Sequence, residues 1–301
     1  MSSHSDTDSD YDSDEPSQLD LDLNELRASA SACLNTECIS AERWTGGTSH
    51  EIFILEFEPK EGVVDTLVQA GFSCIARFAR VSLPGNELRD NSEIATCRYV
   101  KSHTNIPVPE IYHVDLDPDN DVGAPYVLME KMPGKDLYNM WDDLAIDHKK
   151  AVLTQITSVI VQLASLKFDK IGCLNEAGVS PLVSSSSDLP SGPFDSVYAY
   201  LTSFISTVHV RSVELVELYQ QIQKEVAGFL ALNKQATYLQ PSFSMIHADF
   251  DGQNMLFEEQ TGGSPPRLSG IIDWEYSYTG PLYFLYEYPT FIQDFDWYEE
   301  R

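Results

Sequence analysis

Apolar positions along the chain follow two different periods. Up to about residue 132 they alternate with polar positions in short runs, as the residues of half-buried β-strands do. These runs cover 36–57 with a Gly-Gly turn inside, 73–81, 106–115 and 125–132. Helical spacing occurs at 19–35 and again at 88–103, where Ser92 is a candidate N-cap. This part of the chain is therefore predicted to be mostly strand, with one helix inserted between strands.

After residue 135 the apolar residues recur every three or four positions, which is the period of an amphipathic helix. The longest such stretches are 148–168, 194–212 and 213–234. Two short apolar runs follow, on either side of a polar turn at 258–267. The pattern predicts an α+β protein with a small β-rich lobe at 20–132, a hinge near 130–135 and a larger helical lobe at 133–301.

The composition narrows the class of protein and its partners. The chain has 301 residues, of which 43% are hydrophobic, enough to bury a sizeable core. A formal net charge of -28 argues against nucleic acid or an acidic membrane surface as a partner, because both require clustered Lys and Arg. No apolar run reaches the ~18 residues of a membrane span, so we expect no membrane partner.

The first 19 residues are rich in Ser and Asp and contain no Lys or Arg. Such a segment buries too little apolar surface to offset the entropy lost on ordering, so we expect residues 1–19 to be disordered. They contain neither the basic nor the apolar region of a secretory signal. The five cysteines form no CxxC pair, which indicates free, mostly buried thiols in a reducing compartment such as the cytoplasm.

Candidate chemistry is concentrated in one polar loop between apolar residues, "MIHADFDGQNMLF" at 245–257. Asn254 lies just before the first short apolar run, and Asp273 lies near the end of the second. If these runs pair as a hairpin around the 258–267 turn, the amide and the carboxylate come together. One amide oxygen and one carboxylate suit Mg²⁺, which takes oxygen ligands and keeps several waters. Asp249 is then available to accept a proton from a hydroxyl group.

The order of these residues is that of the protein-kinase catalytic loop, in which HxDxxxxN is followed by a metal-binding Asp. "HADFDGQNMLF" together with "GIIDWEYSYTGP" resembles the aminoglycoside phosphotransferase family and is most similar to its uncharacterised fungal members. The resemblance covers about residues 35–295. It implies a protein-kinase-like, two-lobed fold with a five-stranded N-lobe, a hinge that holds adenine, and a helical C-lobe.

The resemblance also implies roles for the residues of the loop. Asp249 would be the catalytic base that orients the acceptor hydroxyl, and Asn254 and Asp273 would hold magnesium. His247 would brace the loop from behind. Apart from the resemblance, Glu275 is interpreted as serving turn geometry. Any one of these residues alone is more often a solvated turn residue, so it is the ordered set that favours function.

On the nucleotide side, Arg77 falls where the family has a third-strand Lys or Arg on the ATP phosphates. Glu93 on the inserted helix would be its ion-pair partner, with Glu87 as a rival. The hinge would present backbone groups of Glu130 and Met132 to adenine. The turn over the phosphates would be formed by Gly46, Gly47 and Thr48.

The resemblance implies an ATP- and Mg²⁺-dependent phosphotransferase that moves the γ-phosphate to a hydroxyl of a small-molecule substrate. Two alternatives stay open. One is a catalytically weak or inactive nucleotide-binding protein with the kinase-like fold. The other is a protein kinase, against which Ala248 stands where those enzymes have Arg. Neither the motif nor the fold names the acceptor.

The end of the sequence raises a separate expectation. Only 20 residues follow Pro281, whereas members of the family usually continue with several more helices. These residues are rich in large apolar side chains, among them Leu282, Phe284, Leu285, Tyr288, Phe291, Ile292 and Phe295. We expect a C-lobe that is cut short, an open acceptor side with weak transfer, and an exposed apolar segment for a protein partner to cover.

Overall fold

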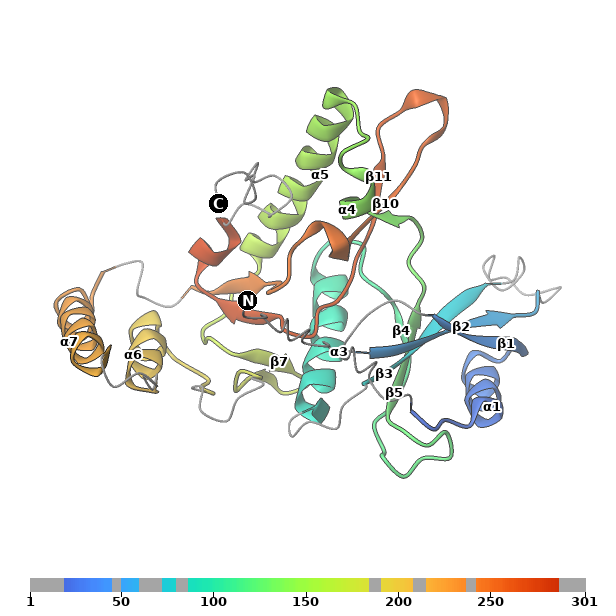
Figure 1. Ribbon diagram of the computed structural model, residues 1–301, viewed down its shortest axis with the longest axis horizontal. Coiled ribbons are helices and arrows are strands. Elements are labelled where there is room, and N and C mark those ends of the chain that lie inside the picture. Colours follow the sequence, from blue (N-terminus) through green and yellow to red (C-terminus); the bar gives the residue numbers. More distant parts are fainter. Residues whose placement is uncertain are drawn as a thin grey trace, which may run out of the picture. The chain divides into compact units, whose positions relative to one another are not determined.

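The computed structural model describes residues 19–44, 50–59, 72–79, 86–183, 191–207, 215–236 and 242–286 (Figure 1). The predicted disordered tail and most of the apolar C-terminal segment lie outside these ranges, and so do Gly46, Gly47 and Thr48. The described residues form two compact units. One contains those up to residue 79 together with 112–129, and the other contains 86–111 and those from 130 onward.

The first unit is built on the five-stranded sheet that the strand pattern predicts. Its strands stand in the order β1 (Cys38–Trp44), β2 (His50–Phe57), β3 (Ser73–Ala79), β5 (Tyr126–Glu130) and β4 (Ile111–Asp115). β1 and β3 both pair antiparallel with β2. Each strand run predicted in this part of the chain is thus confirmed.

One face of this sheet is covered by α1 (Leu23–Leu34), a predicted helix (Figure 1). Asp22 caps the helix, because its Oδ1 atom accepts hydrogen bonds from two backbone N–H groups of the first turn. The buried residues Leu26 and Ala30 pack in one cluster with inward side chains of the strands, among them Phe53, Leu55, Cys74, Ala76 and Phe78. Since successive side chains of a strand alternate between faces, Arg77 lies on the face opposite α1.

The second unit contains five of the described α-helices. They are α3 (Asn86–His103), α4 (Leu137–Met140), α5 (Ile146–Ser165), α6 (Val197–Thr207) and α7 (Val216–Leu232), with the 3₁₀ turns η3 (Gly252–Asn254), η4 (Thr261–Gly263) and η5 (Leu282–Tyr286). The predicted helical stretches are confirmed. Ser92 was wrongly considered as an N-cap, because it lies buried inside α3. The predicted lobe boundaries stay a prediction, and α3, which they assign to the small lobe, belongs to the second unit.

Short strands of the second unit form three small sheets. One has the order β11 (Arg267–Ile271), β10 (Met255–Glu258) and β6 (Lys135–Asp136); the others pair β12 (Tyr278–Gly280) with β9 (Ser244–Ile246), and β7 (Cys173–Asn175) with β8 (Gly178–Ser180). Only the β10–β11 hairpin was expected. Strands of two or three residues have too few positions to show an alternation of apolar and polar residues.

Helix α5 supports this region through a single apolar stripe. Its residues Val152, Ile156, Val159 and Leu163 are buried and recur at intervals of three and four positions. The helix packs against β9, β11 and η5. It is therefore the platform on which the strands around the polar loop rest.

Two broader expectations can be compared with the described residues. No helix among them is long and apolar enough to cross a membrane. All five cysteines are free thiols, and Cys33 is exposed while the other four are buried. The prediction of free, mostly buried thiols is confirmed.

Candidate active site

The polar loop at 247–251 is held at both ends by secondary structure. The strand before it, β9, is fully buried and pairs antiparallel with β12. The hydroxyl of Ser244 in this strand donates to the carbonyl of Ala164 near the end of α5, 3.2 Å away. After the loop, the N–H of Asp251 donates to the carbonyl of Asp249 at 3.0 Å, and η3 begins. The loop is polar but anchored, as its apolar flanks indicated.

Asp249, the predicted catalytic base, is held by the amide of Asn254. The Nδ2 group of Asn254 donates to Oδ2 of Asp249 at 2.7 Å and to the backbone carbonyl of the same residue at 2.9 Å. The Nε2 group of Gln253 reaches the same Oδ2 atom at 3.2 Å. A carbonyl and an ionised carboxylate only accept hydrogen bonds, so the nitrogen of Asn254 must face Asp249. Among the described residues, the amide oxygen of Asn254 makes no hydrogen bond.

The predicted hairpin is present, and it joins the two residues expected to bind the metal. β10 and β11 pair antiparallel, with Met255 opposite Ile271 at their open end. Beyond that pair, the N–H of Ile272 donates to the carbonyl of Asn254 at 3.0 Å. Asp273 thus follows directly on a residue that is hydrogen-bonded to Asn254.

Asp273 has a left-handed backbone conformation, with φ of 65°. A non-glycine residue in this region costs of order 1–3 kcal/mol and persists where its surroundings fix it. Here His247 donates from Nε2 to the carbonyl of Ile272 at 2.9 Å. On the other side, the indole N–H of the fully buried Trp274 donates to the carbonyl of Ile271 at 2.9 Å. These contacts fix the backbone on both sides of Asp273.

His247 braces this segment as a neutral side chain. Burial lowers the pKa of its imidazole below the ordinary value, and the hydrogen bond to Ile272 together with the nearby carboxylates of Asp273 and Asp249 opposes the shift. The ring is therefore neutral at pH 7, with its proton on Nε2, where it donates. Its centroid lies 4.5 Å from the ring of Trp274, at an interplanar angle of 62°. The sequence predicted a brace at this position, and the contact is of that kind.

The donors around Asp273 fit a magnesium ion that keeps water and phosphate oxygens. Within the described ranges, no three or more His, Cys, Asp or Glu side chains gather where they could hold a metal ion. Mg²⁺ is usually bound through one or two carboxylates plus substrate phosphates, so such a cluster is not required. The amide oxygen of Asn254 and the carboxylate of Asp273 are donors of the right type.

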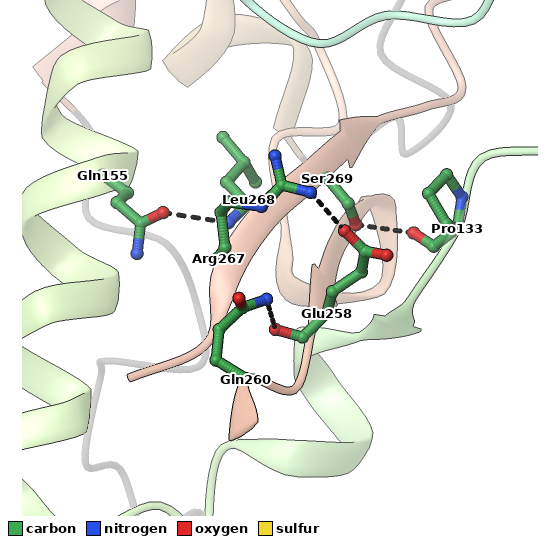
Figure 2. A network of polar contacts seen from close by, with 7 residues as sticks. All are labelled: Pro133, Gln155, Glu258, Gln260, Arg267, Leu268 and Ser269. Atoms are coloured by element: carbon green, nitrogen blue, oxygen red, sulfur yellow. Dashed lines mark hydrogen bonds and ion pairs between the residues drawn. The ribbon is translucent and has the colours of Figure 1, made fainter. Parts of the chain in front are cut away.

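The hairpin is anchored on α5 by one side chain. Gln155 accepts from the N–H of Leu268 through Oε1 and donates from Nε2 to the carbonyl of Pro266, each at 2.9 Å. Figure 2 shows the first of these contacts beside the ion pair of Arg267 and Glu258, which spans the two strands at 2.6 Å. An exposed ion pair contributes ~0–1 kcal/mol, so the doubly bonded amide is the stronger anchor.

The end of the predicted hinge segment joins the other edge of the hairpin. β6 pairs with β10, and the hydroxyl of Ser269 donates to the carbonyl of Pro133 at 2.5 Å (Figure 2). Gly134 has a φ of 106°, and a Cβ at this position would lie 2.6 Å from the carbonyl oxygen of Phe257. The close approach and the backbone conformation both require glycine.

Glu130 and Met132, the predicted hinge positions, make specific contacts within the second unit. The N–H of Glu130 donates to the carbonyl of Glu110 at 2.8 Å, and its carboxylate accepts from the N–H of Glu110 at 3.0 Å. Any backbone contact from Glu130 to adenine would therefore come from its carbonyl. The side chain of Met132 lies against Gly270, where an added Cβ would come within 3.1 Å of it. The adenine-binding roles stay predictions.

Arg77 and Glu93 lie in β3 and α3, in different units, so their ion pair stays a prediction. Within the first unit, Nη2 of Arg77 lies 3.1 Å from Nδ1 of His50 on the neighbouring strand. Glu93 is buried, as glutamates almost never are unless they are paired. The side chain of the rival Glu87 lies outside the described residues.

A buried ion pair beside Asp273 was not predicted. Arg89 of α3 and Glu275 are 8% and 4% exposed, and Nε of the arginine lies 3.6 Å from Oε2 of the glutamate. Nη1 of Arg89 also donates to the hydroxyl of Tyr276 at 3.2 Å. The sequence assigned Glu275 to turn geometry, because its partner lies far away in the chain and leaves no local signal.

The fold is that of the protein-kinase-like phosphotransferases. Of the solved structures with a similar fold, ADP-bound APH(2'')-Ib, an aminoglycoside phosphotransferase, has a TM-score of 0.51 at 14% identity over 86% of this chain and 72% of that one. A thermostable mutant of the aminoglycoside phosphotransferase APH(4)-Ia, in a ternary complex with ADP and hygromycin B, has a TM-score of 0.50 at 16% identity over 86% and 74% of the two chains. Both likenesses confirm the predicted fold class.

Residues 73–284 match the phosphotransferase enzyme family, APH. The match covers well over half of the chain and includes the polar loop and both predicted metal ligands. The chain therefore belongs to the phosphotransferase enzyme family.

Two relatives that are 32% identical match over shorter stretches. A subtelomeric hrmA-associated cluster protein of Aspergillus fumigatus is 32% identical over 83 residues, which are 28% of this chain and 16% of that protein. Altered inheritance of mitochondria protein 9, mitochondrial, of Zygosaccharomyces rouxii is 32% identical over 143 residues, 45% of this chain and 22% of that protein. The chain matches less than a quarter of the length of either relative.

Proposed function

We propose that the protein is an ATP- and Mg²⁺-dependent phosphotransferase that moves the γ-phosphate to a hydroxyl group of a small molecule. The observation that carries the proposal is the 2.7 Å contact between Asn254 and the carboxylate of Asp249, on a loop that the β10–β11 hairpin ties to Asp273. Membership of the phosphotransferase enzyme family supports it. ADP is bound in both of the similar solved structures, which supports a nucleotide as phosphate donor.

In this proposal Asp249 orients the acceptor hydroxyl and takes its proton. Its Oδ2 atom is occupied by Asn254 and Gln253, which leaves Oδ1 to face the acceptor. The hydroxyl oxygen bonds to the γ-phosphorus while the bond from that phosphorus to the departing ADP oxygen breaks, and the hydroxyl proton passes to Asp249. Transfer of this kind depends on positioning and on charge neutralisation.

The other polar residues would support this step. Asn254 and Asp273 would hold magnesium, which neutralises phosphate charge when it is bound. His247 is buried and neutral, so it fixes the backbone beside Asp273 and exchanges no proton with the substrate. The nucleotide would be held by the side chain of Arg77 paired with Glu93 and by backbone groups of Gly46, Gly47, Thr48, Glu130 and Met132.

The proposal specifies the acceptor only as a small molecule with a hydroxyl group and does not name the compound. Hygromycin B is bound by one structurally similar protein, which makes it one compound to include. A cytoplasmic location is part of the proposal, whereas one relative is named as mitochondrial. A protein partner for the apolar C-terminal segment is likewise a proposal, since residues 287–301 lie outside the described ranges.

The proposal can be tested by screening hydroxyl-bearing metabolites and hygromycin B for Mg²⁺-dependent ADP production by the purified protein. At least one compound should raise ADP production and gain one phosphate ester, seen by mass spectrometry. The Asp249→Asn variant should give no product with that compound. Label transfer from [γ-³²P]ATP to a protein substrate alone would support a protein kinase instead. Failure to bind any nucleotide in the presence of Mg²⁺ would refute the proposal.

A further inference from the structure

The ion pair between Arg89 and Glu275 is almost withdrawn from solvent. The two side chains are 10% and 5% exposed. Removing two charges from water costs several kcal/mol per ion, and their attraction offsets this cost only in good geometry. A turn needs no such pair to close, since here the N–H of Ser277 already donates to the carbonyl of Trp274 at 3.0 Å. The buried charges therefore point to a role beyond closing the turn.

The pair acts on the segment that carries Asp273. Glu275 lies two residues after Asp273, and Arg89 also holds the next residue, Tyr276, through its hydroxyl at 3.2 Å. The guanidinium lies 5.9 Å from the centre of the Tyr276 ring. While His247 fixes the backbone before Asp273, Arg89 fixes the two residues that follow Trp274.

Helix α3 carries one predicted nucleotide-site residue and a contact to another. Glu93, one helical turn after Arg89, is the predicted partner of Arg77. Near the end of the helix, Nζ of Lys101 lies 2.9 Å from the carboxylate of Glu110 and 3.8 Å from that of Glu130, a predicted hinge residue. One helix thus contacts the hinge position near one end and the Asp273 segment near the other.

We infer that Arg89 is a positioning residue, which acts through Glu275 to hold the backbone of Asp273 in its left-handed conformation and so prepares that carboxylate to bind the metal. The inference rests on the proposed function, because it takes Asp273 as a metal ligand. Arg89 itself touches neither substrate nor metal in this account. Its loss should weaken the response to Mg²⁺ more than the binding of nucleotide without metal.

The test compares Arg89→Met, Glu275→Gln and the double variant with the unmodified protein. The readout is the Mg²⁺ concentration for half-maximal nucleotide binding, measured with a fluorescent ATP analogue, with affinity in EDTA as the second measurement. Groups that orient a metal ligand typically contribute 10- to 100-fold to metal affinity, so each single variant should raise the required Mg²⁺ about tenfold. Affinity in EDTA should stay at the unmodified level. The double variant should recover part of the loss, because it leaves no unpaired buried charge.

One further variant serves as a control for charge, and another tests the same contact without disturbing the fold. Arg98→Met removes another arginine of α3, whose ion pair with Glu176 is exposed, and should leave the Mg²⁺ requirement unchanged. Tyr276→Phe removes only a hydroxyl from a ring that is 41% exposed, so it should fold normally. It should raise the Mg²⁺ requirement in the same direction but by a smaller factor. If the ion-pair variants fail to fold, this variant decides the question.

Asp273→Ala separates the inference from the proposed function. If nucleotide binding by this variant depends on Mg²⁺ as in the unmodified protein, Asp273 is not a metal ligand. The proposed function and the inference built on it would then both be wrong. If Asp273→Ala loses Mg²⁺ dependence while every folded variant of Arg89, Glu275 and Tyr276 keeps it, only the positioning role is overturned. A lower melting temperature with an unchanged Mg²⁺ requirement would likewise show that the pair is merely structural.

Discussion

Replacing Gln155 by leucine should loosen the hairpin that carries Asn254 and Asp273. Leucine has a similar size but cannot form a hydrogen bond. The change leaves the N–H of Leu268 and the carbonyl of Pro266 without the partner that each has at 2.9 Å. It also removes a longer contact, at 3.3 Å, from Nε2 to the carbonyl of Ala151 in α5, so the main perturbation falls on two backbone groups of the hairpin.

The magnitude follows from those two groups. A buried polar group that loses its partner costs ~1–3 kcal/mol. Both contacts of Gln155 are only partly buried, so water can replace some of the loss and the lower value applies. Two groups at about 1 kcal/mol each lower the free energy of unfolding by ~2 kcal/mol. For a chain of 301 residues that corresponds to a drop of about 3 °C in melting temperature.

The assay is urea or thermal unfolding followed by circular dichroism. Gln155→Glu is the second variant: it keeps an acceptor for Leu268 but turns a carboxylate oxygen toward the carbonyl of Pro266, so it should cost no less than Gln155→Leu. A Gln155→Leu protein whose stability stays within ~0.5 kcal/mol of the unmodified protein would refute the reasoning, since changes of that size are typical of surface substitutions away from any such contact.

Other changes have equally specific outcomes. Asp249→Asn should lower turnover by ~10²–10⁴ while nucleotide binding persists, measured by steady-state kinetics and titration; unmodified turnover would contradict the assignment of the base. The pKa of His247 is lower in the folded protein than the value of about 6.5 in the unfolded chain. Its contribution to stability is therefore full above pH 6.5 and is lost as the pH falls below that value, by up to ~1.4 kcal/mol per pH unit. His247→Gln should make the stability of the protein less dependent on pH on the acid side. Burial raises the pKa of Cys74 to about 12, so iodoacetamide at pH 8 should label Cys33 first, and mass spectrometry showing early adducts on Cys74 would contradict the fold. Gly134→Ala should destabilise more than Gly262→Ala, since both positions have positive φ but only at Gly134 does the new Cβ meet another atom, and equal melting temperatures would contradict this packing.

The strands and helices that could be predicted are those long enough to show a period. The alternation in β2 and β3 and the stripe of α5 each extend over seven or more residues, and each was predicted with its type. β6 and β9 have two and three residues and were missed, although β9 holds the polar loop in place. Ser92 shows the opposite error. Serine is a favourable N-cap residue, but α3 begins at Asn86 and Ser92 lies inside the helix.

For the site, the order of residues predicted the chemistry, and the contacts that support it could not be predicted. Asp249, Asn254 and Asp273 lie within one short part of the chain, where spacing and a hairpin suffice to relate them. Gln155 and Arg89 reach that part from α5 and α3, and nothing in their local sequence distinguishes them from surface polar residues. Burial and distance, which only the fold supplies, give them their roles.

The pairing of β9 with β12 has a consequence for how the protein is made. The strand that leads into the polar loop pairs with residues 278–280, and the hydroxyl of Ser269 donates to a carbonyl 136 residues earlier in the chain. Contacts between residues far apart in the chain form late in folding. The chain loses entropy when it closes the intervening loop, and the contact contributes its stabilising free energy only afterwards. During synthesis the ribosome must release the chain beyond residue 280 before β9 can pair, so earlier fragments carry the predicted site residues but not their arrangement. A chain split anywhere before that strand should regain its site only when both pieces are present together.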